Sequence, residues 1–183
     1  HCGYYMQGSL HLHPYWELHA AVHTDSFAET AAHVRELLTD AVRRQLVSDV
    51  PIGTFLSGGL DSSLLSSLSS QVLRERGETL HTFSVDYRDN DRYFQKSHFQ
   101  PTSDPAYIRA MERYLGCQHH WTVLDTPALA EALYAAVDAR DLPGMVDVDS
   151  SLLLFCGEIR KEVTVALSGE CADELFGGYP WYR

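Results

Sequence analysis

Two short segments of this sequence combine hydroxyls, glycines and acids in an order suited to binding a phosphate-bearing ligand. The first is Ser57-Gly58-Gly59-Leu60-Asp61-Ser62, which follows an apolar run and precedes a helical pattern. Adjacent glycines let the backbone turn tightly and approach an anion closely. The first amides of the following helix are unpaired donors at the positive end of its dipole. The segment therefore predicts an oxyanion site, although the glycines could simply make the turn while Asp61 and Ser62 cap the helix.

The second segment is Ser168-Gly169-Glu170-Cys171-Ala172-Asp173-Glu174, which follows the last apolar run of the chain. Its three acids could do no more than stabilise a helix N-terminus. Beside a second Ser-Gly turn, metal ligation and acid–base chemistry are the favoured interpretation. Mg²⁺ prefers carboxylate and phosphate oxygens, and Asp61 with Asp173 could supply the carboxylates.

The two segments need a scaffold that places them side by side, and the hydrophobic pattern predicts one. Buried strands are expected at 52–56, 80–85, 119–124 and 163–167, with helices at 60–77, 105–115, 126–139 and 149–161 between them. This alternation is typical of an α/β protein with a parallel sheet and helices on both faces. In such sheets, ligands bind beyond the carboxyl ends of neighbouring strands whose connections leave in opposite directions. If the first and fourth strands are neighbours, both Ser-Gly turns face one crevice.

Local signals set the ends of several helices. Ser26 and Glu29 form a capping box for a helix over 24–47. Gly116 is expected to close the helix that precedes it, and Thr126 to cap the next one. Asp149-Ser150 is expected to cap the last long helix, with a loop before it.

Two further segments lie outside this alternation. A hairpin is expected around Gln7-Gly8-Ser9. Residues 88–104 lack a clear period and are expected to form a long connection, either functional or a plain surface excursion.

Composition excludes several classes of protein. The chain has 183 residues, 45% of them hydrophobic, and a formal net charge of −11. This length and apolar content fit one globular domain with a buried core. The acidic balance argues against a nucleic-acid surface, which needs clustered Lys and Arg. Because no apolar run reaches the roughly 18 residues of a membrane span, we expect no membrane partner and a cytoplasmic setting.

Neither the cysteines nor the N-terminal histidines are spaced like metal ligands. The cysteines contain no Cys-x-x-Cys pair and are expected to be reduced thiols: Cys2, Cys117, Cys156 and Cys171. The N-terminal histidines have no acid or thiol at ligand spacing and are interpreted as surface or packing residues: His11, His13, His19 and His23.

The first segment matches neither common nucleotide-binding loop, because the sequence contains no Gly-x-x-x-x-Gly-Lys-[Ser/Thr] and no Gly-x-Gly-x-x-Gly. It resembles the pyrophosphate loop of the ATP pyrophosphatase superfamily, whose members cleave ATP between the α and β phosphates. Together with the second segment through Tyr179, it resembles the synthetase domain of glutamine-dependent asparagine synthetases. The resemblance takes in Asp141–Gly144 and Asp149–Ser151 and spans roughly 24–183.

This resemblance implies a Rossmann-like fold of the adenine nucleotide α-hydrolase (ATP pyrophosphatase) type. It also implies an ATP-dependent amidoligase that makes asparagine from aspartate, ATP and glutamine-derived ammonia through β-aspartyl-AMP. By the same resemblance, pyrophosphate and its Mg²⁺ are held by Ser57, Gly58, Gly59, Asp61 and Ser62. Adenosine is held by Phe55 or Leu56, Val85, Ser168 and Gly169. Catalysis depends on Glu170 with Asp61 and Asp173, of which the two aspartates also hold the metal.

The chain departs from the family pattern in two ways. The family more often has glycine at the position of Cys171. An amidotransferase domain normally precedes this region, and further helices normally follow it. We therefore expect 1–23 to be a hairpin and linker from a missing glutaminase domain, and 24–183 to be an ATP-binding synthetase domain truncated at its C-terminus. The chain by itself is expected to be inactive, and the complete protein to form a homodimer.

Two alternatives stay open from the sequence. A relative on the same scaffold could close a β-lactam or amidate another carboxylate. A non-catalytic nucleotide-binding module is the other alternative. The joint presence of Asp61, Glu170 and Asp173 favours an enzyme, because ATP binding alone does not require all three.

Overall fold

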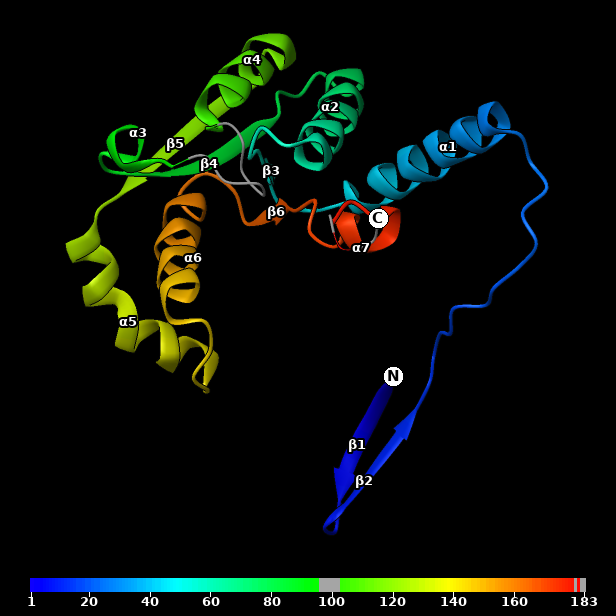
Figure 1. The fold of residues 1–183 in the computed structure, drawn as a ribbon, viewed down its shortest axis with the longest axis horizontal. Coiled ribbons are helices and arrows are strands. Elements are labelled where there is room, and N and C mark those ends of the chain that lie inside the picture. The colour runs from blue at the N-terminus through cyan, green and yellow to red at the C-terminus, as the bar shows by residue number, and fades with distance from the viewer. Residues whose placement is uncertain (96–102, 180, 182–183) are drawn as a thin grey trace. The chain divides into compact units, whose positions relative to one another are not determined.

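The computed structural model describes residues 1–95, 103–179 and 181 (Figure 1). The chain divides into two compact units, 1–36 and 37–183, and the boundary falls inside helix α1 (Phe27–Gln45). The first unit contains the antiparallel hairpin of β1 (Cys2–Met6) and β2 (Ser9–His13). Its turn has positive φ angles at Gln7 (50°) and Gly8 (79°), as in the turns that match the twist of two-residue hairpins. The predicted hairpin is confirmed.

The capping box at the start of α1 is also confirmed. The Ser26 amide donates to Glu29 Oε2 at 2.8 Å, and the Glu29 amide donates to Ser26 Oγ at 3.3 Å. The hydrogen bonds from Ser26 lower the pKa of Glu29.

Four parallel strands form the sheet of the second unit in the order β5-β4-β3-β6. They are β3 (Ile52–Phe55), β4 (His81–Tyr87), β5 (Gln118–Leu124) and β6 (Val165–Leu167). The first and fourth strands of this sheet along the chain, β3 and β6, are neighbours, with Ile52 opposite Val165 and Thr54 opposite Leu167. The connections from β3 to β4 and from β5 to β6 leave in opposite directions, so the order reverses between β3 and β6.

Helices cover both faces of this sheet, as predicted (Figure 1). On one face lie α2 (Leu60–Glu75) and α4 (Pro105–Leu115); on the other lies α6 (Val146–Ile159), against which α5 (Thr126–Arg140) packs. One buried cluster joins α6 to Phe83 of β4, and a second joins Val42 of α1 and Val72 of α2 to the opposite face. The short helices α3 (Asn90–Tyr93) and α7 (Ala172–Phe176) complete the described elements.

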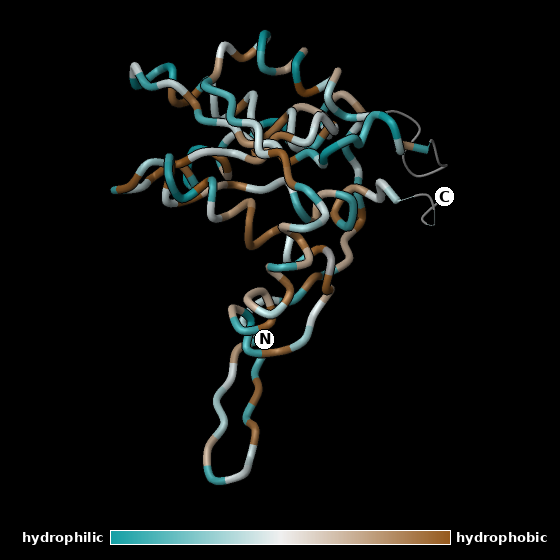
Figure 2. The backbone as a smooth tube through the Cα atoms, turned by 90° about the vertical axis from the view of Figure 1, so that its left-hand side faces the viewer, coloured by the Kyte–Doolittle hydropathy of each residue, from teal (hydrophilic) through white to brown (hydrophobic). Residues whose placement is uncertain are grey.

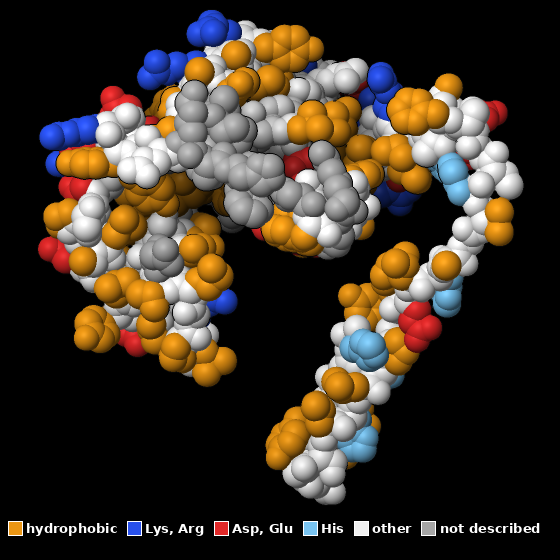
Figure 3. Space-filling view, in the orientation of Figure 1, with side chains coloured by type: hydrophobic (Ala, Val, Ile, Leu, Met, Phe, Trp, Pro, Cys, Tyr) orange, Lys and Arg blue, Asp and Glu red, His pale blue; other side chains and the backbone are white. Residues whose placement is uncertain are grey.

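Hydrophobic and hydrophilic residues are mixed along most of the backbone (Figure 2). No described helix combines the length and apolar character that crossing a membrane requires. The four N-terminal histidines, predicted to be surface or packing residues, are exposed, and Figure 3 shows histidines on the surface of this segment. All four cysteines are free.

Serines supply most of the buried side chains of α2. Ser62, Ser66, Ser69 and Ser70 are buried with Val72 and Leu73, whereas Leu64 is 43% exposed. Small side chains let the helix lie close to the strand. Thr54 of β3 and Ser66 form a buried hydrogen bond of 2.8 Å between their hydroxyls.

Two expected helix caps are wrong, and one of the two helices begins three residues earlier than predicted. The N-cap of α5 is Asp125, whose carboxylate accepts from the Ala128 amide at 3.0 Å, so Thr126 is the first helical residue and not the cap. Helix α6 begins at Val146, so the expected loop ends earlier than predicted. Asp149 does not cap it: this residue is buried and forms an ion pair with Arg140 at the end of α5. That contact between two helices cannot be read from local sequence.

The long connection after β4 includes the short helix α3, and its residues 96–102 lie outside the described part of the chain.

The end of α4 lies where the sequence predicts it. The helix closes at Gly116, which has a φ of 59° and donates its amide to the Glu112 carbonyl.

The turn after β3 requires glycine at one of its two glycine positions. Gly58 has a φ of +81°, and a Cβ there would lie 3.0 Å from Tyr107 Cβ. Gly59, the N-cap of α2, has a φ of −72° and a ψ of 168°, which any residue can adopt. The nearest atom to a Cβ on Gly59 is Ser57 Oγ at 3.4 Å.

We expect Gly58→Ala to destabilise the protein by roughly 1–2 kcal/mol, because alanine resists the left-handed conformation, with a further cost from the contact with Tyr107. Gly59→Ala is the matched control and should stay within about 0.5 kcal/mol of wild type. There, the weaker N-cap preference of alanine and the lower entropy of the unfolded chain oppose each other. Urea unfolding of the two variants measures the difference. Equal destabilisation would contradict the assignment of the conformational requirement to Gly58.

Candidate functional site

The two Ser-Gly turns meet at the carboxyl ends of β3 and β6. Gly169 lies directly on the start of α2, because a Cβ built on it would be 3.2 Å from both Asp61 Cβ and the Ser62 amide nitrogen. A larger residue at this position would crowd the start of α2 and require a shift of a few tenths of an ångström. The prediction that both turns face one crevice is therefore confirmed.

A cavity of about 260 Å³ lies between the two turns. It is lined by most of the residues that the sequence singled out: Phe55, Ser57, Gly59, Asp61, Ser62, Ser168, Gly169, Glu170 and Asp173, with Cys171, Ala172, Glu174 and Tyr179. Gly58 does not line it, since it faces Tyr107 and Ile108 instead. Asp61 and Asp173 are half-buried, and Glu170 is exposed.

The lining of this cavity is strongly acidic. Four of its described lining residues are Asp or Glu, and none is Lys or Arg. An anionic ligand would be repelled here unless a cation entered with it. Hard carboxylate oxygens from two different turns are the donors that Mg²⁺ prefers. In the described part of the chain, these acids do not form a cluster of three ligand atoms within 4.8 Å. The arrangement therefore fits an ion held jointly by one or two carboxylates and a ligand's oxygens.

The first turn is held by its own hydroxyls. Ser62 is buried, and its Oγ accepts from the Ser57 amide at 3.1 Å and lies 2.9 Å from Ser57 Oγ. The N-cap of α2 is Gly59, which supplies no side-chain cap. Asp61 is the second residue of α2, so the alternative in which Asp61 and Ser62 cap the helix is wrong. Without a side-chain cap, the first amides of α2 can serve as donors to an anion.

The conformation of the second turn explains why the family more often has glycine at the position of Cys171. Cys171 has a φ of +71°, in the left-handed region. The Glu170 amide donates to Ser168 Oγ at 3.2 Å, and α7 starts immediately afterwards. The turn thus directs a run of acids into the cavity rather than continuing as a strand.

Tyr179 closes one side of the acidic cavity. Its hydroxyl donates to Glu174 Oε1 at 3.1 Å. This hydrogen bond raises the pKa of Tyr179, and burial and the negative charge of Glu174, Asp173 and Glu170 raise it further. The phenol is therefore a neutral hydrogen-bond donor at neutral pH.

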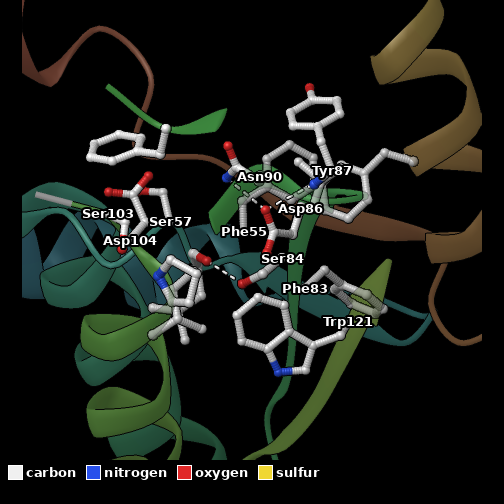
Figure 4. A pocket seen from close by; sticks show the side chains of 16 residues that line it. Phe55, Ser57, Phe83, Ser84, Asp86, Tyr87, Asn90, Ser103, Asp104 and Trp121 are labelled. Carbon is white, nitrogen blue, oxygen red and sulfur yellow. Dashed lines mark hydrogen bonds between the residues drawn. The ribbon is translucent and has the colours of Figure 1, made fainter. Parts of the chain in front are cut away.

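A second cavity, of about 390 Å³, adjoins the first, and Phe55 and Ser57 line both (Figure 4). Its other walls include the predicted Leu56 and Val85, and apolar rings and chains from β4, β5, α4 and α6. Leu56 is fixed at this place because its amide donates to the Phe83 carbonyl at 2.8 Å and its own carbonyl accepts from Ser84 Oγ. A largely apolar cavity beside a phosphate-type turn suits a flat aromatic base.

Several lining residues of the second cavity were not proposed as site residues from the sequence, among them Asp86, Asn90 and Trp121. Asn90 Nδ2 donates to Asp86 Oδ1 at 2.8 Å, and Figure 4 shows the two side chains meeting at the cavity wall. Asp86 could have been found, because it stands at the carboxyl end of a strand. Asn90 and Trp121 reach the cavity only through tertiary folding.

The family model described as asparagine synthase matches residues 33–183. The chain is 52% identical over 180 residues to asparagine synthetase [glutamine-hydrolyzing] 3 of Bacillus subtilis, an alignment that covers 98% of this chain and 29% of that protein. It is 30% identical over 184 residues to amidase chry2 of Gibberella zeae, covering 93% of this chain and 26% of that protein.

Among solved structures, the fold is similar to a crystal structure of NAD+ synthetase from Burkholderia pseudomallei. The TM-score is 0.43 at 16% identity, covering 84% of this chain and 67% of the other. The chain thus spans less than a third of the length of the two curated relatives above, and the family match includes both Ser-Gly turns. On the strength of the family model and the Bacillus relative, this chain belongs to the asparagine synthase family.

Proposed function

We propose that the crevice between the two Ser-Gly turns is the ATP site of an enzyme that makes asparagine from aspartate and glutamine-derived ammonia. The observation that carries this proposal is the direct contact of Gly169 with Asp61 and Ser62, which combines two sequence-distant turns in one acid-lined cavity beside an apolar one. Membership of the asparagine synthase family supports it.

In this proposal, the adenine base of ATP occupies the apolar cavity beside Leu56 and Val85. Ser168 and Gly169 lie next to the sugar. The pyrophosphate part lies over the first turn, where the amides at the start of α2 donate to its oxygens. Ser57, Gly58, Gly59 and Ser62 give this turn its shape.

Asp61 and Asp173 would hold Mg²⁺ together with the phosphates, because both line the acidic cavity and no Lys or Arg among its described lining residues neutralises them. When bound, the ion would neutralise charge that develops on the leaving pyrophosphate. Binding of nucleotide and ion would then be mutually dependent.

The reaction has two steps. The β-carboxylate of aspartate attacks the α-phosphorus of ATP, forming an acyl-phosphate bond and releasing pyrophosphate. Ammonia then attacks the acyl carbon of β-aspartyl-AMP, loses a proton and displaces AMP. Glu170 lines the same cavity on the second turn and is exposed to entering ligands, so we assign it the acceptance of that proton.

The remaining parts of the proposal concern the complete protein. A glutaminase domain before residues 1–23 would supply ammonia, and helices after the second turn would complete the aspartate site. We further propose that residues 24–183 act as one ATP-binding unit, that the complete protein is a homodimer, and that it works in the cytoplasm.

A second candidate is a relative that amidates another carboxylate or closes a β-lactam on the same scaffold. The likeness to a protein named as an amidase favours keeping this candidate. A nucleotide-binding module without catalysis is less favoured, because it would not need acids from both turns in one cavity.

The deciding experiment is an assay of the complete protein for AMP and pyrophosphate release with ATP, Mg²⁺ and a panel of amino acids, with aspartate first. Aspartate-dependent release and asparagine formation are expected. Release of AMP and pyrophosphate with a different amino acid would replace aspartate as the acceptor but keep the assignment of the ATP site. Binding of ATP without release of either product for any acceptor would leave only the non-catalytic nucleotide-binding module.

Asp61→Asn in the complete protein should abolish pyrophosphate release while leaving the fold intact. The change removes a metal-binding charge, and it does not touch a helix cap because the N-cap of α2 is Gly59. Glu75→Gln is the matched control, since Glu75 is at the other end of α2 and forms only an exposed ion pair with Arg43. Pyrophosphate release and circular dichroism are the readouts. Wild-type turnover by Asp61→Asn would exclude metal binding by this residue.

Glu170→Gln should impair amide formation by about 10²-fold and impair aspartate adenylation much less, as expected for loss of a general base. The amide keeps the size and hydrogen bonding of the side chain but cannot accept the proton. Rapid-quench measurement of both half-reactions separates the steps. Equal losses in both would assign Glu170 to the organisation of ATP and metal, and no loss would remove it from the mechanism.

A further inference from the structure

Two histidines and a glutamate from three different elements come together at the amino end of the sheet, the edge opposite the ATP-type cavity. His81 is the first residue of β4, His120 lies in β5, and Glu162 follows α6 on the way to β6. His81 Nδ1 is 3.1 Å from His120 Nε2. One ligand atom from each of the three residues lies within 4.8 Å of the other two, and no other such trio occurs in the described part of the chain.

The parallel register explains why the two imidazoles meet. His81 and Phe83 stand two residues apart on β4, so they emerge on the same face of the sheet, and Phe83 is the cross-strand partner of His120. The two imidazole planes differ by only 10°, with centroids 5.2 Å apart. The Phe83 ring lies 4.8 Å from the His120 ring at an angle of 16° and fixes its orientation. The pair is therefore held by the sheet and not by flexible loops.

The charges around this trio favour a cation. Glu162 forms no ion pair with Lys or Arg among the described residues, whereas the neighbouring Lys161 is paired with Glu158. Neutral imidazole, rather than imidazolium, is the form of histidine that binds a metal ion.

We propose that His81, His120 and Glu162 form a binding site for Zn²⁺, outside the ATP site and independent of the proposed synthetase function. Two imidazole nitrogens and one carboxylate oxygen are typical Zn²⁺ ligands, with a water in the fourth position. The same donors suit Mg²⁺ poorly, because imidazole favours transition metals. The ion would replace the proton between the two rings, and that proton would move to the far nitrogen of the same ring.

The distances need only a small adjustment. With Zn–N bonds of about 2.0–2.1 Å in a tetrahedral site, the two nitrogens lie roughly 3.3 Å apart, against 3.1 Å between the hydrogen-bonded rings. The exposed side chain of Glu162 can close the remaining gap by rotating. The bound ion would link β4, β5 and the connection that leads into β6. It would stabilise the folded state by an amount that grows with the logarithm of its free concentration once that concentration exceeds Kd.

A second pair of possible Zn²⁺ ligands lies elsewhere in the chain, and the test must distinguish it from the proposed site. In the N-terminal hairpin, Cys2 Sγ lies 2.9 Å from His13 Nε2, and both side chains are exposed. A thiolate would also attract Zn²⁺. The two locations differ in donor type, since the proposed site contains no sulfur.

The test is titration of the metal-stripped intact protein with Zn²⁺ by calorimetry, and with Co²⁺ by absorption spectroscopy, in wild type and four variants. Glu162→Gln and His120→Gln remove proposed ligands, whereas Cys2→Ser removes the competing thiol and His33→Gln removes an exposed histidine of α1. We expect one Zn²⁺ per chain that survives Cys2→Ser and His33→Gln. Because loss of an outer-shell partner alone costs about 10–100-fold in affinity, Glu162→Gln and His120→Gln should each weaken binding by at least that factor.

Two further readouts distinguish the loss of a metal ligand from misfolding of a variant. Zn²⁺ should raise the urea midpoint of wild type but not that of Glu162→Gln, whose exposed side chain has no role in the core. Bound Co²⁺ in Cys2→Ser should show ligand-field bands without a thiolate charge-transfer band. Absence of Zn²⁺ binding, or binding that is lost in Cys2→Ser and unchanged in Glu162→Gln, would overturn the proposal.

Discussion

Parallel pairing of β3 with β6 brings two distant segments of the chain into contact, and the candidate site depends on this contact. The pairing ends with Thr54 opposite Leu167, so the Ser57 and Ser168 turns begin at the same edge of the sheet. Gly169 then lies against the first turn of α2, where a Cβ would crowd Asp61 and the Ser62 amide. A shift in this register would separate the acids of the two turns and remove the cavity between them.

The packing on both faces of the sheet holds that register. On one face, the serines of α2 allow close approach to β3, and the bond between Thr54 and Ser66 satisfies two buried hydroxyls. On the other face, Phe155 of α6 packs against Phe55, the last residue of β3. Polar and apolar contacts therefore fix opposite sides of the same short strand. The position of the first turn is set by both.

The two candidate ligand regions of the molecule differ in the charge and type of their donor groups. At the carboxyl edge, acids from two turns surround backbone amides and hydroxyls, an arrangement that favours a hard cation beside a phosphate. At the amino edge, two imidazoles and one carboxylate offer a softer set of donors. The two regions lie at opposite ends of the same parallel strands, so occupation of one does not obstruct the other.

The sequence by itself determined the order of strands and helices, the hairpin turn, the capping box of Ser26 and Glu29, and the closing of α4 at Gly116, because each depends on residues close together in the chain. It also identified both Ser-Gly turns, since their residue types are unusual over a few positions. Only the tertiary structure decided the remaining features: the pairing of Asp149 with Arg140, the buried serines of α2, the cavity walls at Asn90 and Trp121, and the meeting of His81 with His120. Each of these depends on a contact between elements, and local patterns do not encode which elements become neighbours.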